Sequence, residues 1–193
     1  YAYDAFGNKV SETDALGHQT TFEYGLRDPT HTFVERSTNA LGHQAEFGYD
    51  LGTGNMLWQK KNDILTSFEY DTFGRISKEV KPYDSSVLPT KRYNYTFDGG
   101  APETVFVTLR ETGDATSRVL QYHYDGFAQV VQIKSESDNS EYITKNLYYD
   151  AQGRVVGEDN PYFASYSIFT SPVNGPPSVN YTYDAVGRVI FVL

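Results

Sequence analysis

The residues of this 193-residue chain that could most readily do chemistry are aspartates that recur along its length. Glycoside hydrolysis, for example, needs two carboxyl groups about 5–10 Å apart in different environments. Here the recurring aspartates stand at the start of Asp-x-x-Gly segments or close variants. Asp at the first position and Gly at the fourth are typical of a type I turn, because the carboxylate can bond the backbone two residues on and Gly takes positive φ. The aspartates therefore predict repeated turns, and we expect no catalytic residues.

These predicted turn positions share one frame along the chain. They are Asp4, Gly7, Asp71, Gly74, Asp125, Asp150, Gly153, Asp184 and Gly187. The clearest copy is Tyr181–Ile190, in which Tyr-x-Tyr precedes the turn and Arg and apolar residues follow it. A type I turn followed by a left-handed Gly is a common connection between two antiparallel strands. Each copy is therefore predicted to be a β-hairpin.

Hairpins of this kind recur throughout the sequence. The positions equivalent to the turn aspartate are 4, 25, 50, 71, 98, 125, 150 and 184, at spacings of 21 to 34 residues. One hairpin is not stable alone in water, so the copies must pack on their neighbours. We expect an all-β fold of consecutive antiparallel hairpins in a curved sheet, covering residues 1–193 as one segment. Both ends fall within a repeat unit, which favours a piece of a longer protein.

Other chemistries find little support in the sequence. There is no cysteine, and the equivalent residues His18 and His43 are explained by a repeated Leu-Gly-His turn. No Gly-x-Ser-x-Gly segment is present, and the glycines of 51–55 fit a hairpin better than a phosphate loop. We expect no metal and no cofactor. A net charge of −9, from 16 basic and 25 acidic residues, argues against nucleic acid as a partner. No apolar run approaches the ~20 residues of a membrane helix, so we expect no membrane insertion by this segment.

Tyrosine is abundant, with 17 copies. Alternation along a strand places both rings of Tyr-x-Tyr on one face. Tyrosines from successive hairpins are therefore candidates for an aromatic ladder, in which each pair contributes roughly 0.2–1 kcal/mol beyond burial. The candidates are Tyr3, Tyr49, Tyr70, Tyr124, Tyr149 and Tyr183. The alternative is that an exposed aromatic face binds carbohydrate.

The repeated Tyr-x-Tyr-Asp-x-x-Gly-Arg units resemble the YD (RHS) repeats of bacterial rearrangement-hotspot proteins, toxin-complex proteins and teneurins. The resemblance covers nearly the whole chain. Two stretches look most like the YD region of insecticidal toxin-complex B components and SpvB-like proteins. They are residues 124–127 followed by 131–134, and residues 161–164 running to Pro177 and Tyr183-Asp184.

This resemblance implies a segment of a spiral, hollow shell that encloses a toxic C-terminal polypeptide. It implies a secreted or cell-surface bacterial protein whose partners are the rest of its own shell, the enclosed polypeptide and other toxin-complex subunits. The family's self-cleaving Asp-Pro-x-Gly segment is absent, because Asp28-Pro29 is followed by Thr30-His31. We therefore expect no enzymatic activity. The alternative is a cell-surface adhesion module that uses the same repeats to bind glycans.

Overall fold

Short β-strands alternate with tight turns along the chain, as the spacing of the turn residues predicts. The computed structural model describes residues 1–97, 99–100, 102–111, 117–137, 140–165, 168–172 and 177–192. In these ranges it contains seventeen strands and no helix. The chain divides into two compact units, residues 1–90 and 91–193, and each is described by itself below.

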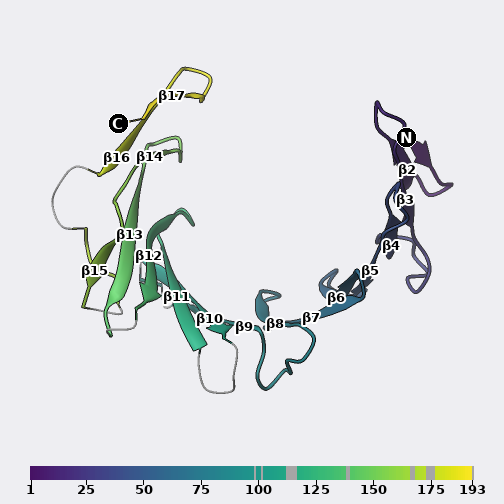
Figure 1. The fold of residues 1–193 in the computed structure, drawn as a ribbon, viewed down its shortest axis with the longest axis horizontal. Coiled ribbons are helices and arrows are strands. Elements are labelled where there is room, and N and C mark those ends of the chain that lie inside the picture. Colours follow the sequence, from purple (N-terminus) through teal and green to yellow (C-terminus); the bar gives the residue numbers. More distant parts are fainter. Residues whose placement is uncertain are drawn as a thin grey trace. The chain divides into compact units, whose positions relative to one another are not determined.

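The first unit is a run of eight antiparallel strands that pair in chain order (Figure 1). The strands are β1 (Ala2–Tyr3), β2 (Lys9–Thr13), β3 (Gln19–Glu23), β4 (Arg36–Thr38), β5 (Gln44–Tyr49), β6 (Met56–Lys61), β7 (Ile64–Tyr70) and β8 (Ile76–Val80). Because successive turns alternate between the two ends of such strands, the turns that begin at Asp4, Asp50 and Asp71 share one end. Those that begin at Asp14 and Asn39 lie at the other.

The second unit follows the same plan with longer strands. They are β9 (Lys91–Thr96), β10 (Glu103–Arg110), β11 (Ser117–Tyr124), β12 (Val130–Glu136), β13 (Tyr142–Tyr149), β14 (Val155–Glu158), β15 (Tyr162–Ala164), β16 (Val179–Tyr183) and β17 (Val189–Val192). Strands β9 to β14 pair antiparallel in chain order. β15 and β14 both pair with β13, and β16 joins β14 to β17. The turns that begin at Asp125, Asp150 and Asp184 again share one end of the strands.

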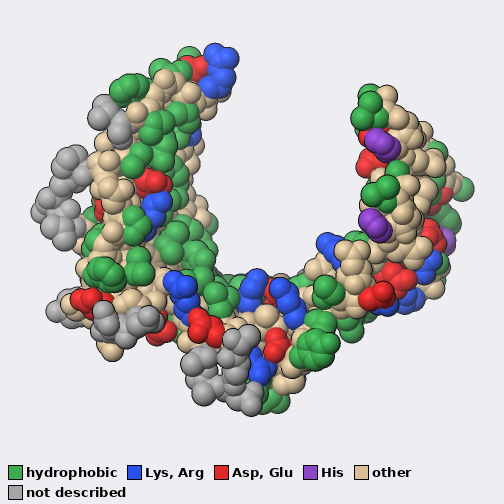
Figure 2. All heavy atoms as spheres, viewed as in Figure 1, with side chains coloured by type: hydrophobic (Ala, Val, Ile, Leu, Met, Phe, Trp, Pro, Cys, Tyr) green, Lys and Arg blue, Asp and Glu red, His purple; other side chains and the backbone are tan. Residues whose placement is uncertain are grey.

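Both units are single sheets with very little apolar core. Among the described residues only Pro89, Val105 and Val107 are buried apolar side chains, whereas ten polar or charged side chains are buried. Hydrophobic side chains are visible on the surface of both units in Figure 2. The strands are therefore held mainly by the backbone ladder, and the prediction of an all-β array of antiparallel hairpins is confirmed. Asp98, one of the eight predicted turn positions, lies outside the described residues.

One turn departs from the repeat in a way that has an energetic cost. Ala128 takes the place of the fourth-position Gly and has φ of 61°, in the left-handed region. The equivalent Gly74, Gly153 and Gly187 have φ of 76°, 78° and 84°. A Cβ in this region is disfavoured by roughly 1–2 kcal/mol, so this turn is strained where the others are relaxed.

We predict that Ala128→Gly raises the free energy of unfolding by about 0.5–1 kcal/mol, because relief of the left-handed strain exceeds the added chain entropy of Gly. Urea unfolding followed by circular dichroism measures the change. Gly126→Ala in the same turn is the matched control: this Gly has no positive φ, and an added Cβ meets nothing within 4 Å. A destabilised Ala128→Gly protein would contradict the assignment of strain.

Candidate functional site

The recurring turns form a hydrogen-bonded bracket around one carboxylate or amide oxygen. In seven turns the first residue accepts, through Oδ1, the backbone N–H groups two and four residues later, at 2.8 to 3.0 Å. The turns begin at Asp4, Asp14, Asn39, Asp71, Asp125, Asp150 and Asp184. The fourth residue also donates its N–H to the first residue's carbonyl. Each Oδ1 is thus committed to closing its turn. The turn that begins at Asp50 is one residue longer, and its Oδ1 bonds Gly52 and Thr53 instead.

The residue after the turn glycine completes the bracket through its side chain. Nε of Arg75, Arg154 and Arg188 donates to Oδ2 of the aspartate four residues earlier, at 2.7, 2.7 and 2.6 Å. Asn8 and His18 stand at the same position and bond their aspartates at 3.2 and 2.9 Å. The Arg of the repeat motif is therefore explained as the partner of the turn aspartate.

These contacts also set the charge of the turn carboxylates. The backbone N–H and the guanidinium of Arg188 lower the pKa of Asp184, and the backbone N–H of Arg154 likewise lowers the pKa of Asp150. Carboxylates held in this way are ionised hydrogen-bond acceptors at neutral pH. A general acid needs a raised pKa instead, so these carboxylates are unsuited to that role.

A second recurring contact joins neighbouring hairpins through the tyrosine before the turn position. The hydroxyl of Tyr70 donates to the backbone carbonyl of Met56 at 2.8 Å. The same bond links Tyr24 to Lys9, Tyr149 to Val130 and Tyr183 to Val155, at 3.3, 2.9 and 2.6 Å. In all four cases the acceptor lies two residues, and the tyrosine three residues, beyond the last backbone pair of the two strands. We call this contact the tyrosine clamp, because it ties adjacent strands where their ladder has ended.

The clamp gives three of the predicted ladder tyrosines, Tyr70, Tyr149 and Tyr183, a different role from ring stacking. Among the described residues, no ring pair joins two of Tyr3, Tyr49, Tyr70, Tyr124, Tyr149 and Tyr183. Tyr49 stacks on Phe33 instead, at 4.7 Å between centroids. Burial raises the pKa of Tyr70 and of Tyr149, which keeps the donated proton on each hydroxyl. Of the six candidates, Tyr70, Tyr149 and Tyr183 make the clamp, and Tyr24, which was not a candidate, makes it too.

We predict that Tyr70→Phe lowers the free energy of unfolding by about 1 kcal/mol, the usual net value of one hydrogen bond, because it removes only the clamp hydroxyl. Urea unfolding measures the loss. Tyr3→Phe is the matched control, since Tyr3 is 62% exposed and has no clamp bond, and it should change stability by less than about 0.5 kcal/mol. Equal effects of the two substitutions would refute a stabilising clamp.

A group of buried polar side chains on β11, β12 and β13 was not predicted from the sequence. Backbone register places His123, Gln132 and Asn146 in one row across the three strands, and Gln121, Lys134 and Thr144 in the next row. We call these six residues the polar face. All are at most 3% exposed. The sequence feature that could have indicated it is alternation, since Gln132 and Lys134 alternate with the apolar residues Val131 and Ile133 along one strand.

Hydrogen bonds connect one row of the polar face to the residues around it. Nε2 of Gln132 donates to Oδ1 of Asn146 at 2.6 Å. Nδ2 of Asn146 donates to Oδ2 of Asp159 at 2.6 Å and to the Tyr162 hydroxyl at 3.1 Å. Such connected networks fix side-chain positions in a buried setting.

The charges of the polar face are shifted by burial. The imidazole of His123 bonds the Thr104 hydroxyl through Nδ1 at 2.9 Å. Burial first, and then the nearby Lys134 ammonium, lower the pKa of His123 from 6.5 to about 4. Burial also lowers the pKa of Lys134. His123 is therefore neutral at physiological pH.

We predict that His123 makes the fold acid-sensitive between pH 6.5 and about 4. As the pH falls through 6.5, the unfolded chain takes up a proton on this ring and the folded chain does not, so the free energy of unfolding falls until about pH 4. NMR titration of the ring should give a midpoint near 4, and His123→Gln should flatten the pH dependence of urea unfolding in this window. A midpoint near 6.5 would contradict the burial of this ring.

In the first unit, the loop between β3 and β4 carries the most heavily bonded carboxylates. Asp28 and Glu35 are each 2% exposed. The Thr30 hydroxyl and the backbone N–H groups of 30, 32 and 33 hold the pKa of Asp28 at about 2. Glu35 accepts the backbone N–H groups of Arg27 and Asp28, and the Arg27 guanidinium lies over the Trp58 ring at 4.9 Å. These carboxylates are fully engaged in shaping the loop.

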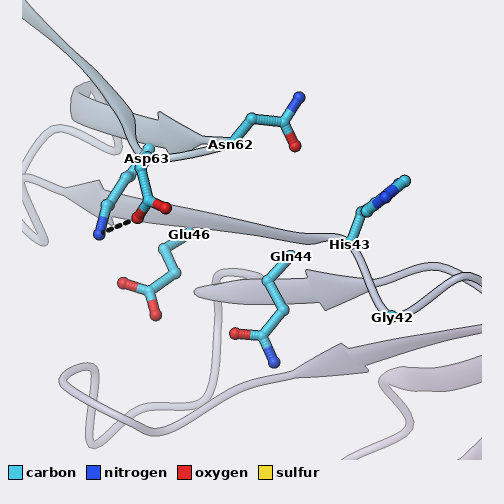
Figure 3. Close-up of a pocket in the computed structure, with 7 residues that line it drawn as sticks. Gly42, His43, Gln44, Glu46, Asn62 and Asp63 are labelled. Carbon is cyan, nitrogen blue, oxygen red and sulfur yellow. Dashed lines mark ion pairs between the residues drawn. The ribbon is translucent and has the colours of Figure 1, made fainter.

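A shallow polar hollow lies near the ends of β5 and β6 (Figure 3). It is lined by Gly42, His43, Gln44, Glu46, Lys60, Asn62 and Asp63. Asn62 and Asp63 both have positive φ, as in a two-residue type I′ hairpin turn, and Asp63 pairs with Lys60 at 2.8 Å. No Tyr, Trp or Phe lines the hollow. It lacks the flat aromatic surface on which a sugar ring packs.

Two further classes of site were sought within the described ranges. No three His, Asp or Glu side chains come together there in a way that could hold a metal ion. The same residues include no helix that is long and apolar enough to cross a membrane.

Comparison with known proteins defines the fold class. No protein-family model matches the chain, and no curated protein sequence matches it. Solved structures do match. The chain is similar to the crystal structure of TcdB2-TccC3-TEV, with a TM-score of 0.65 and 13% sequence identity. The match covers 97% of this chain and 14% of that one, so the chain spans a small part of its structural relative. The shared property is the all-β, antiparallel hairpin fold.

Proposed function

We propose that the chain is a non-catalytic structural segment of a toxin-complex-type YD-repeat protein, secreted or displayed at a bacterial cell surface. In this role its hairpin sheet helps to enclose another polypeptide. Its partners are the neighbouring hairpins of the same shell, the enclosed polypeptide and other subunits of the complex.

The observation that carries the proposal is that one hairpin unit repeats along the chain. The fold that these hairpins form is shared with TcdB2-TccC3-TEV over 97% of the chain. The Asp bracket and the tyrosine clamp both recur in each unit. A repeated contact that joins each hairpin to the next is suited to a shell built from many copies of one structural unit. A non-catalytic role is supported by the turn carboxylates, because each accepts backbone N–H groups and three of them also accept an arginine side chain.

Carbohydrate binding is less well supported. The hydroxyls of Tyr70, Tyr149 and Tyr183 are bonded to backbone carbonyls and are engaged within the sheet. The polar hollow near β5 and β6 offers no tyrosine, tryptophan or phenylalanine to a sugar. We therefore prefer encapsulation to glycan recognition.

Limited proteolysis of the natural polypeptide that carries this chain tests encapsulation. We expect one part of that polypeptide to resist protease in native buffer and to be digested once urea opens the sheet. In the triple variant Tyr70→Phe, Tyr149→Phe and Tyr183→Phe the protected part should be released at a lower urea concentration, because three clamps are lost.

The control for this experiment is Tyr3→Phe, which removes a hydroxyl outside the clamps. Digestion of every part at the same rate without urea would overturn the proposal. Binding to a glycan array that disappears in the triple variant would favour the adhesion alternative instead.

We also predict that the isolated chain self-associates through β17. This strand pairs with β16, and no second pairing of it occurs in the described part of the chain. All four of its side chains are more than half exposed. Exposed apolar edge strands promote pairing between chains. Light scattering should show association that increases with concentration and that Ile190→Lys reduces.

Val186→Lys is the matched control for Ile190→Lys. Val186 is 76% exposed but lies in the turn, so a charge there should leave association through the strand edge unchanged. A monodisperse monomer at high concentration would contradict this prediction.

A further inference from the structure

One short segment of the chain is held on the polar face in the way that a bound peptide is held. The segment is 168–172, with the sequence Ile-Phe-Thr-Ser-Pro. Both backbone polar groups of Thr170 pair with the side chain of Gln132. Gln132 Nε2 donates to the Thr170 carbonyl at 2.8 Å, and the Thr170 N–H donates to Gln132 Oε1 at 3.2 Å. A side-chain amide that bonds both the N–H and the carbonyl of one residue recognises an extended backbone, as a neighbouring strand does.

The side chains of the segment are recognised as well. The Phe169 ring meets the His123 ring edge-on, at 5.7 Å between centroids and an interplanar angle of 63°. Nζ of Lys134 donates to the Thr170 hydroxyl at 3.3 Å. The contacts therefore select an aromatic residue followed by a residue with a hydroxyl group.

Residues outside the segment hold the central receiving side chain. With the segment in place, Gln132 and Lys134 have no exposed surface, and His123 is 1% exposed. The Gln132 amide is held by Asn146, which is itself held by Asp159 and Tyr162. Preorganised polar groups of this kind reduce the entropy cost of binding.

The polar face also has hydrogen-bonding capacity that residues 168–172 leave unused. Nε2 of His123 and Oε1 of Gln121 are buried and have no hydrogen-bond partner among the described residues. Buried polar atoms are nearly always paired, so atoms of this kind mark a place where another ligand group can bind. A segment that served only to plug the sheet would be expected to satisfy them.

We propose that the polar face of β11–β13 is a peptide-recognition site, which residues 168–172 occupy in cis. It takes an extended segment of a polypeptide that carries an aromatic residue followed by Thr or Ser. The cis segment competes with such a ligand at the millimolar effective concentration typical of a short tether, so it blocks weak ligands. The site goes beyond the proposed role of the chain as a shell segment, and either can hold without the other.

The test uses the full chain with a weakened cis segment, Phe169→Ala with Thr170→Pro. These changes remove the ring contact, the N–H that Gln132 accepts and the hydroxyl that Lys134 bonds. The probe is the acetylated and amidated pentapeptide Ile-Phe-Thr-Ser-Pro. NMR follows the side-chain amide of Gln132 and the ring of His123 during titration. We expect saturable shifts, with a dissociation constant at least tenfold lower than in the wild-type chain.

A second peptide distinguishes specific recognition from non-specific association. It carries an N-methyl group at the threonine, which removes the N–H that donates to Gln132 and places a methyl group there. We expect it to bind at least fivefold more weakly, the usual effect of one lost hydrogen bond. Amide hydrogen exchange of β11–β13 checks that the sheet is intact.

If the double variant loses this protection, Phe169→Ala alone serves as the host, because it keeps both Thr170–Gln132 bonds. Absence of saturable binding to a host with an intact sheet would overturn the proposal. Equal binding of the two peptides would overturn it too.

Discussion

Sheets that bury only three apolar side chains among their described residues must satisfy their polar groups locally. With so little apolar packing, each hairpin has to close its own turn and join its own neighbour. The Asp bracket meets the first requirement by saturating one side-chain oxygen with two N–H groups. The tyrosine clamp meets the second by bonding a carbonyl beyond the end of the ladder. The backbone ladder sets the strand order, and these two devices close the turns and tie the strands where the ladder ends.

Much of this architecture could be predicted from the sequence because the devices are local. A turn needs residues only four apart, so Asp71 and Gly74 indicate a hairpin without knowledge of the rest of the fold. The alternation in 181–183 likewise predicts a strand. The resemblance to YD repeats added the expectation of an array, and the described strands agree with it.

The polar face lay beyond such reasoning because it depends on register across three strands. His123, Gln132 and Asn146 are nine and fourteen residues apart in sequence and adjacent only once the hairpins are paired. The contact of Thr170 with Gln132 spans 38 residues and no repeat predicts it. The clamp was missed for a different reason: Tyr70, Tyr149 and Tyr183 were identified and Tyr24 was not, and the sequence does not reveal whether the ring or the hydroxyl of a tyrosine makes the important contact.

The acceptor of the clamp is a backbone carbonyl, a group that every residue possesses. Lys9, Met56, Val130 and Val155 fill the acceptor position in the four clamps, so a charged side chain serves there as well as an apolar one. One partner of the contact is thus free to change through evolution while the other must remain tyrosine. An array built in this way can keep its fold with very different sequences, because the clamp constrains the spacing of a few residues and leaves most of their neighbours free to vary.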